Sequence, residues 1–313
     1  MLMGNQSADT EFVFLGFSSF PEPHSLFFLL FLTMYITTVL GNGLILATAW
    51  LDSGLHMPMY YFIRHLSFLD ICYTSVTLPH MLRNLMAETK TISFHGCLIQ
   101  IYFLVAFVGI ECLLLAVMAY DRYVAICHPL SYSLFMNRKV CTQLVAASWA
   151  CGLLNSIMHT TMTALLPFCA SRSLDHLFCD VPQLLKLACM DTFPNQMTLL
   201  VVTLLLGVSP FLCILVSYVH IVAAILRIRT THGRHKAFST CASHLIVVTL
   251  FYTTCMFNYN RPSSKHPVYI DTLASVLYNA VTPMLNPIIY CLRNKEMKDA
   301  LKRVLNPKVP SSL

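Results

Sequence analysis

Two carboxylates lie deep inside long apolar runs of this 313-residue chain, where a charged side chain is costly. Asp70 stands 12 residues into the run that begins at Pro58, and Glu111 stands 11 residues before Arg122. If both runs are helices rising about 1.5 Å per residue, both carboxylates lie roughly 16–18 Å from the same side of a bilayer. Such a pair either holds a sodium ion, since hard cations prefer oxygen ligands, or keeps one carboxyl protonated in a polar packing network.

A second charged group, Asp121-Arg122, follows the apolar run IYFLVAFVGIECLLLAV. Neighbouring residues on a helix do not face each other, and an exposed ion pair contributes only about 0–1 kcal/mol. One interpretation is simple anchoring by positive charge on the inner side of a membrane. The other is a conformational latch that opens when a partner arrives.

Apolar segments must position these groups. The chain is 57% hydrophobic and 11% charged, whereas a soluble domain has roughly 25% charged residues. Lipid is therefore the expected solvent. A spanning helix needs about 20 mostly apolar residues, whereas a barrel strand alternates apolar and polar residues over about 10, and the long apolar runs of this chain match the helix. We predict an all-α membrane protein, a seven-transmembrane helix bundle with spans near 25–50, 58–84, 97–122, 140–166, 196–226, 238–259 and 268–292.

Lys and Arg set the orientation of these spans. Thirteen of the 20 basic residues fall on the side of the C-terminus, namely Arg122, Arg138, Lys139, Arg227, Arg229, Arg234, Lys236, Arg293, Lys295, Lys298, Lys302, Arg303 and Lys308, and six fall on the other. The C-terminus is thus predicted to be cytoplasmic, in a plasma membrane. The net charge of +6 suggests an anionic lipid or protein surface rather than nucleic acid, because the basic residues form short blocks.

The outer side is expected to carry an N-terminal tail, residues 1–24, in which Asn5 opens a glycosylation tripeptide. This tail has no basic region typical of a cleavable signal peptide. Cys97, Cys169, Cys179 and Cys189 also fall on the outer side, where two disulfides are expected. No histidine spacing such as HExxH occurs, so we expect no cofactor other than the sodium ion.

Six short motifs carry a family resemblance. MAYDRYVAICHPLSY at 118–132, LHMPMYYF at 55–62, KAFSTCASHL at 236–245, SY at 217–218, PMLNPIIYCLRNKEM at 283–297 and LSFLDICYTS at 66–75 resemble the signatures of olfactory receptors of the tetrapod type, within the rhodopsin-like G-protein-coupled receptors. The resemblance covers nearly the whole chain, in order. It implies a transmembrane domain at 25–292 and a cytoplasmic amphipathic helix and tail at 293–313.

The resemblance implies roles for the matching residues. Arg122 is held by Asp121 when the receptor is inactive and is released toward Tyr218 when it is active, with Tyr123 beside them. The moving end of the seventh span comprises Asn286, Pro287 and Tyr290, and Asp70 with Glu111 is the sodium pair. The disulfides pair Cys97 with Cys179 and Cys169 with Cys189.

The resemblance also implies a ligand pocket in the outer half of the bundle. Its expected lining is Leu104, Val105, Val108, Gly109, Val202, Thr203, Leu206, Tyr252, Cys255, Met256, Tyr259 and Asn279. Ordinary interhelical packing also produces helical faces of this kind. A pocket so lined is apolar and has no buried charge, which predicts a small, neutral, mostly hydrophobic volatile ligand.

The leading interpretation is therefore an odorant receptor, not an enzyme, that activates a stimulatory G protein of the olfactory type and raises cyclic AMP. Its expected partners are a volatile odorant, that G protein, membrane lipid and trafficking chaperones. The alternative is a seven-helix transporter or ion-coupled carrier. A transporter would show paired repeats and a channel would show rings of polar side chains, and the sequence has neither.

Overall fold

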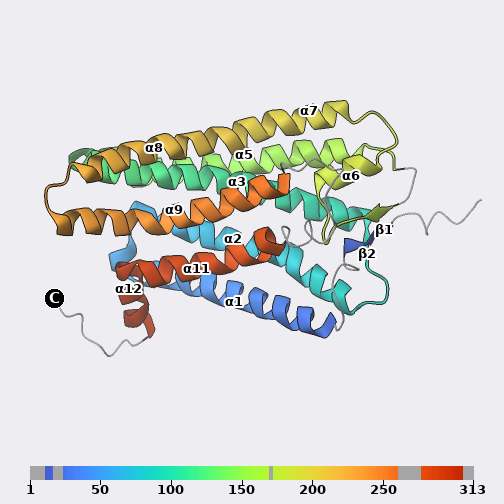
Figure 1. Ribbon diagram of the computed structural model, residues 1–313, viewed down its shortest axis with the longest axis horizontal. Coiled ribbons are helices and arrows are strands. Elements are labelled where there is room, and N and C mark those ends of the chain that lie inside the picture. The colour runs from blue at the N-terminus through green and yellow to red at the C-terminus, as the bar shows by residue number, and fades with distance from the viewer. Residues whose placement is uncertain (1–10, 17–23, 169–171, 260–275, 306–313) are drawn as a thin grey trace, which may run out of the picture.

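The computed structural model of the protein describes residues 11–16, 24–168, 172–259 and 276–305. Long helices run side by side along the molecule, with small strands at one end and a short transverse helix at the other (Figure 1). The α-helices are α1 (His24–Leu51), α2 (Pro58–Met86), α3 (Phe94–Cys127), α4 (Tyr132–Phe135), α5 (Arg138–Ala164), α6 (Val181–Leu187), α7 (Phe193–Val202), α8 (Ser209–Leu226), α9 (Thr231–Tyr259), α11 (Thr282–Arg293) and α12 (Lys295–Leu305). Short 3₁₀ turns cover Ser53–Leu55 and Pro129–Ser131.

Helices occupy the described part of every predicted span, so the predicted all-α membrane bundle is confirmed. Four helical stretches in the described residues are long and apolar enough by themselves to cross a membrane: α1, α3, α5 and Phe193–Leu226. The helix α2 is as long as these, but it contains charged residues such as Arg64 and Asp70.

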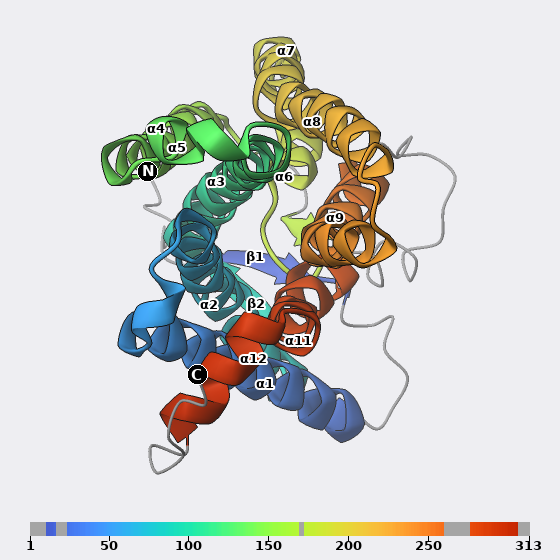
Figure 2. The same ribbon diagram turned by 90° about the vertical axis from the view of Figure 1, so that its left-hand side faces the viewer.

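The outward faces of the bundle are apolar, which is the arrangement that a lipid solvent requires. Exposed leucines and valines follow α1 and α8, and among them are Leu26, Leu40, Leu215 and Val219. The interior is mainly apolar as well, but several hydroxyl, amide and carboxyl side chains are buried there. Seen along the helix axes, α3 lies with α2 and α5 on one side of the bundle, and α9 and α11 lie on the other (Figure 2).

Two π-helical segments interrupt the predicted fifth and seventh spans. Thr203–Val208 joins α7 to α8 in the fifth span, and Leu277–Val281 directly precedes α11 in the seventh. Each ends two residues before a proline, Pro210 or Pro283. Proline has no N–H to bond the carbonyl four residues earlier, so the regular α-helical ladder is broken there. Pro287 likewise leaves the Pro283 carbonyl without its helical donor, and the Asn42 amide on α1 donates to that oxygen at 3.2 Å.

The end of the bundle that is predicted to be the outer one carries a three-stranded sheet that the sequence analysis did not predict. β1 (Glu11–Phe14) pairs antiparallel with β2 (Thr91–Ser93) and parallel with β3 (Ser173–Leu174), in the order β2-β1-β3. Its short segment EFVF buries two aromatic rings, Phe12 and Phe14, and exposes the alternate side chains. Part of the predicted N-terminal tail is thus packed onto the bundle.

The opposite end, which is predicted to be the inner one, is closed by α12, which lies across the ends of α1 and α11 (Figure 2). Arg303 on α12 forms an ion pair with Asp52 at 2.8 Å, and this contact lowers the pKa of the Asp52 carboxyl. The Tyr60 hydroxyl donates to Glu296 at 2.7 Å. These contacts hold the predicted amphipathic helix against the first inner loop and the start of α2.

Candidate functional site

A cavity of about 190 Å³ lies in the outer half of the bundle. It is smaller than the roughly 300–1,000 Å³ of drug-sized ligand sites, which favours a small ligand. Residues from α3, α5, the fifth span, α9 and the outer loop line it: Val105, Val108, Gly109, Cys112, Asn155, His159, Asp180, Val181, Pro182, Leu199, Val202, Thr203, Leu206, Gly207, Val208, Tyr252 and Cys255.

The π-helical segment of the fifth span shapes this cavity. Four lining residues, Thr203, Leu206, Gly207 and Val208, come from that segment. A π segment carries an extra residue in its turn and so shifts the side chains around it, and such segments often occur at functional sites. On the opposite wall, Gly109 of α3 faces Gly152 of α5 closely, since a Cβ on Gly109 would lie 3.6 Å from the Gly152 Cα.

Eight of the twelve residues expected at the pocket line this cavity: Val105, Val108, Gly109, Val202, Thr203, Leu206, Tyr252 and Cys255. Leu104 and Asn279 are buried in the bundle but are not part of the lining. Met256 and Tyr259 belong to α9, and their side chains lie outside the described residues.

Three polar lining residues were missed by the sequence analysis, which expected a pocket without a buried charge. Asn155 and His159 come from α5, and Asp180 comes from the outer loop. Burial raises the pKa of the half-buried Asp180 to about 6, because apolar surroundings disfavour the ionised carboxyl. The spacing of Asn155 and His159, four residues apart on one helix, was the available signal.

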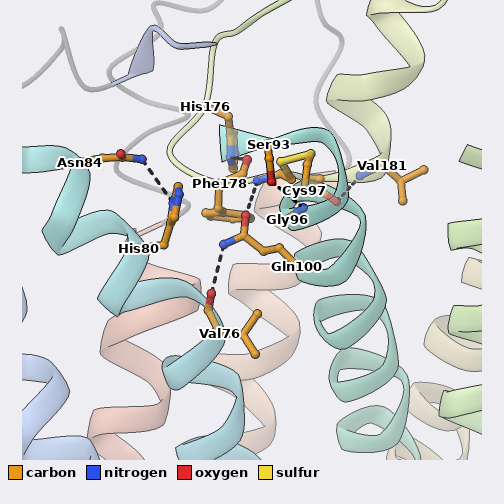
Figure 3. The surroundings of a disulfide bond; sticks show 12 residues. Val76, His80, Asn84, Ser93, Gly96, Cys97, Gln100, His176, Phe178 and Val181 are labelled. Atoms are coloured by element: carbon orange, nitrogen blue, oxygen red, sulfur yellow. Dashed lines mark hydrogen bonds between the residues drawn. A yellow bond between two sulfur atoms is a disulfide. The ribbon is translucent and has the colours of Figure 1, made fainter. Parts of the chain in front are cut away.

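A disulfide fixes the outer loop above the cavity. Cys97 at the start of α3 is bonded to Cys179, which confirms that pairing. Gln100, one turn further along α3, accepts from the Cys179 N–H at 2.8 Å and donates to the Val76 carbonyl of α2 at 3.1 Å (Figure 3). The loop is thereby held to two helices, and Asp180 follows the cysteine directly.

The second predicted disulfide is described at one of its two cysteines only, and the predicted glycosylation site is not described. Cys189 is disulfide-bonded, while Cys169 and Asn5 lie outside the described residues. Both expectations therefore stay predictions.

The two interior carboxylates occupy one polar layer between α2, α3 and α11. Asp70 and Glu111 are 2% and 8% exposed, and they are close enough for their charges to interact. The Asn286 amide donates to both Asp70 oxygens, at 3.0 and 3.2 Å. No basic side chain in the described part of the chain forms an ion pair with either carboxylate.

Asp121 and Arg122 near the C-terminal end of α3 are not paired with each other in this structure, and their switching role stays a prediction. Asp121 accepts from the Tyr132 hydroxyl at 2.7 Å, and no ion pair within 4.0 Å joins it to Arg122 among the described residues. The helix continues to Cys127, so the two side chains point in different directions from consecutive positions. Arg122 instead lies near enough to Tyr218 and Tyr290 for its charge to act on both.

A histidine connects three helices beside Arg122. The His244 Nε2 lies 3.1 Å from the Leu115 carbonyl of α3, and its Nδ1 lies 2.7 Å from the Tyr218 hydroxyl of α8. A carbonyl only accepts, so Nε2 carries the proton, and in the neutral ring Nδ1 then accepts from Tyr218. Tyr123 meets His128 at 3.1 Å nearby. The inner ends of α3, α8 and α9 are thus joined through polar side chains.

Comparison with known proteins agrees with these features. The sequence profile of the family described as "Olfactory receptor" matches residues 31–308. Olfactory receptor 1F1 of Homo sapiens is 52% identical over 96% of both chains, and olfactory receptor 1f45 of Rattus norvegicus is 50% identical over 98% of both. Olfactory receptor 2G3 of Homo sapiens is 47% identical over 99% of this chain and 100% of its own.

Proposed function

This chain belongs to the olfactory receptor family, and we propose that it binds a small, mostly hydrophobic volatile in the cavity between α3, α5, the fifth span and α9. It is a multi-pass protein of the plasma membrane and not an enzyme. The observation that carries the ligand proposal is the cavity itself, which is small and lined mainly by valine, leucine and glycine. Apolar walls with few polar groups suit a volatile molecule that itself carries few hydrogen-bonding groups.

Binding would act by shifting an equilibrium between inactive and active forms, because a ligand favours the form to which it binds better. The cavity and the polar contacts of His244 with Tyr218 and the Leu115 carbonyl involve the same helices, namely α3, the fifth span and α9. A change in the packing of these helices at the cavity can therefore reach the His244 contacts and Arg122. The active form would open an inner cleft for a stimulatory G protein of the olfactory type, and cyclic AMP would rise.

The inner surface suits such a partner by its charge. The segment RIRTTHGRHK at 227–236, which runs into the start of α9, is strongly basic, and α12 adds Lys298, Lys302 and Arg303. These residues lie on the side that the charge distribution assigns to the cytoplasm, where anionic lipid attracts basic segments. We place the N-terminus outside the cell on the same basis.

Sodium is the proposed occupant of the layer around Asp70 and Glu111. Two buried carboxylates that form no ion pair with a basic side chain in the described ranges favour a cation with oxygen ligands. Purified receptor should melt at a higher temperature in sodium chloride than in choline chloride of equal ionic strength, and Glu111→Gln should remove that difference. Identical melting in both salts for the unaltered protein would exclude the sodium site.

The proposed function is tested by measuring cyclic AMP in cells that express the chain with an olfactory-type G protein, over a panel of neutral volatiles. We expect a response that Arg122→Ala abolishes at equal surface level. Arg138→Ala is the matched control, because Arg138 is an exposed arginine at the start of α5, and it should retain the response. A response that survives Arg122→Ala would contradict the proposed switch, and a surface-expressed receptor silent to every volatile would contradict the proposed ligand class.

A further inference from the structure

One wall of the cavity is polar, and two of its buried atoms have no hydrogen-bond partner within the described part of the chain. Asn155 and His159 lie four residues apart on α5, so both side chains occupy one face of that helix. Both line the cavity. His159 is 3% exposed, and neither its Nε2 nor the Asn155 Oδ1 has a hydrogen-bond partner among the described residues.

Unpaired polar atoms are unusual in the interior of a folded protein. The neighbouring residue Ser156 does have a partner, because its hydroxyl donates a hydrogen bond to the Tyr102 carbonyl of α3. Asn155 and His159 differ in that both residues line the cavity. Their unpaired atoms are themselves buried, so a bound molecule reaches them after a small rotation of the two side chains at the cavity wall.

The chemistry of these atoms discriminates between oxygen functions. The Asn155 Oδ1 only accepts, and the ionised Asp180 carboxyl at the rim of the same cavity also only accepts. A neutral imidazole has one donor and one acceptor. A ligand hydroxyl can donate to the amide oxygen and accept from the histidine, and it finds a partner in either orientation of the amide and either tautomer of the ring. A ketone or aldehyde can only accept, and an alkane does neither.

A charged amine fits less well, although it could donate to the same atoms. The remaining walls are apolar, and transfer of a full charge into such surroundings is costly. Asp180 offers an amine only part of its capacity, because its carboxylate already accepts from the Val181 N–H at 2.8 Å. The polar wall therefore suits a neutral donor.

We propose that the cavity selects neutral volatile alcohols, with the hydroxyl group held by Asn155 and His159 and the alkyl chain lying against the apolar walls from α3 and the fifth span. This inference rests on the proposed function for the location of the ligand. It adds the chemical class of that ligand and two specificity-determining residues on the fourth span.

The test measures direct binding to the purified full-length chain. The readout is the rise in melting temperature as the ligand concentration increases. The probes are 1-hexanol, 1-octanol and 1-decanol, each with the aldehyde and the alkane of the same length. We expect the alcohol to bind more tightly than both counterparts in at least one length. Asn155→Leu and His159→Leu should each weaken alcohol binding by roughly threefold to tenfold, the effect of one lost hydrogen bond, and leave alkane binding unchanged.

Ile157→Ala is the matched control, because this residue lies on the same helix and is 51% exposed on its outer side. It should leave alcohol binding unchanged. The unaltered chain decides the question by itself if a variant fails to fold: equal affinity for alcohol, aldehyde and alkane, or no binding of any alcohol, would overturn the inference. Alcohol binding without a cyclic AMP response would contradict only the proposed signalling function.

Discussion

At the scale of single residues, the absence of a side chain matters most where two helices meet. Gly152 of α5 packs against α3, and a Cβ there would lie 2.8 Å from the Ala106 carbonyl and would also collide with the Ile110 side chain. Small residues allow helix backbones to approach closely in membranes, where lipid gives helices no hydrophobic reason to associate. This contact forms the wall behind Gly109 of the cavity.

Gly152→Ala should therefore destabilise the protein by about 1–3 kcal/mol, because the close-packed interface must separate to admit the methyl group. The measurement is the melting temperature of the purified receptor. Gly43→Ala is the control, since nothing lies within 4 Å of a Cβ at that position. Equal melting temperatures for the two variants would show that the α3–α5 contact is not as tight as described.

At the scale of elements, the strand β1 ties the start of the chain to the outer loop. Phe12 is 1% exposed and its ring packs against Phe94 and Phe168, at centroid distances of 6.3 and 5.6 Å. The neighbouring Val13 points away and is 41% exposed. Because β1 pairs with both β2 and β3, it links the segment before α3 to the loop that carries Cys179 and Asp180.

Phe12→Ala should cost about 3–5 kcal/mol through loss of buried aromatic surface, whereas Val13→Ala should cost far less. Thermal unfolding of the two purified variants, compared with the unaltered chain, checks this expectation. A loss of stability that is the same for both variants would mean that the strand is not packed on the bundle.

At the scale of the whole molecule, charge determines how the bundle sits in the membrane. The basic residues of the third inner loop and α12 lie at the end opposite the sheet, which is visible in Figure 1 as the separation of α12 from β1 and β2. Positive charge is retained on the cytoplasmic side during insertion. The sheet and the cavity should therefore face the outside.

An epitope tag placed before Met1 should be labelled on intact cells, and a tag placed after Leu313 should be labelled only after permeabilisation. Flow cytometry with each tag in the same cell line is sufficient. Labelling of the C-terminal tag on intact cells would reverse the orientation and would place the basic loop outside.

The sequence by itself determined the spans. In lipid every backbone N–H and C=O group must be hydrogen-bonded within the protein, and a long apolar run meets this requirement by forming a helix. It located Asp70 and Glu111 at one depth, because helical rise converts residue number into distance. It also identified Cys97 and Cys179 through family resemblance, and it named eight of the seventeen residues that line the cavity.

Only the tertiary structure decided which side chains meet across helices. The contact of Asp121 with Tyr132 and the sheet formed by β1 join segments that are separated by a loop or distant in sequence. The structure also shows that Asn155 Oδ1 and His159 Nε2 have no hydrogen-bond partner among the described residues. Local pattern fixes the face of a helix but not the neighbour that the face contacts, because that neighbour depends on close approaches at glycine and on the π segments before Pro210 and Pro283.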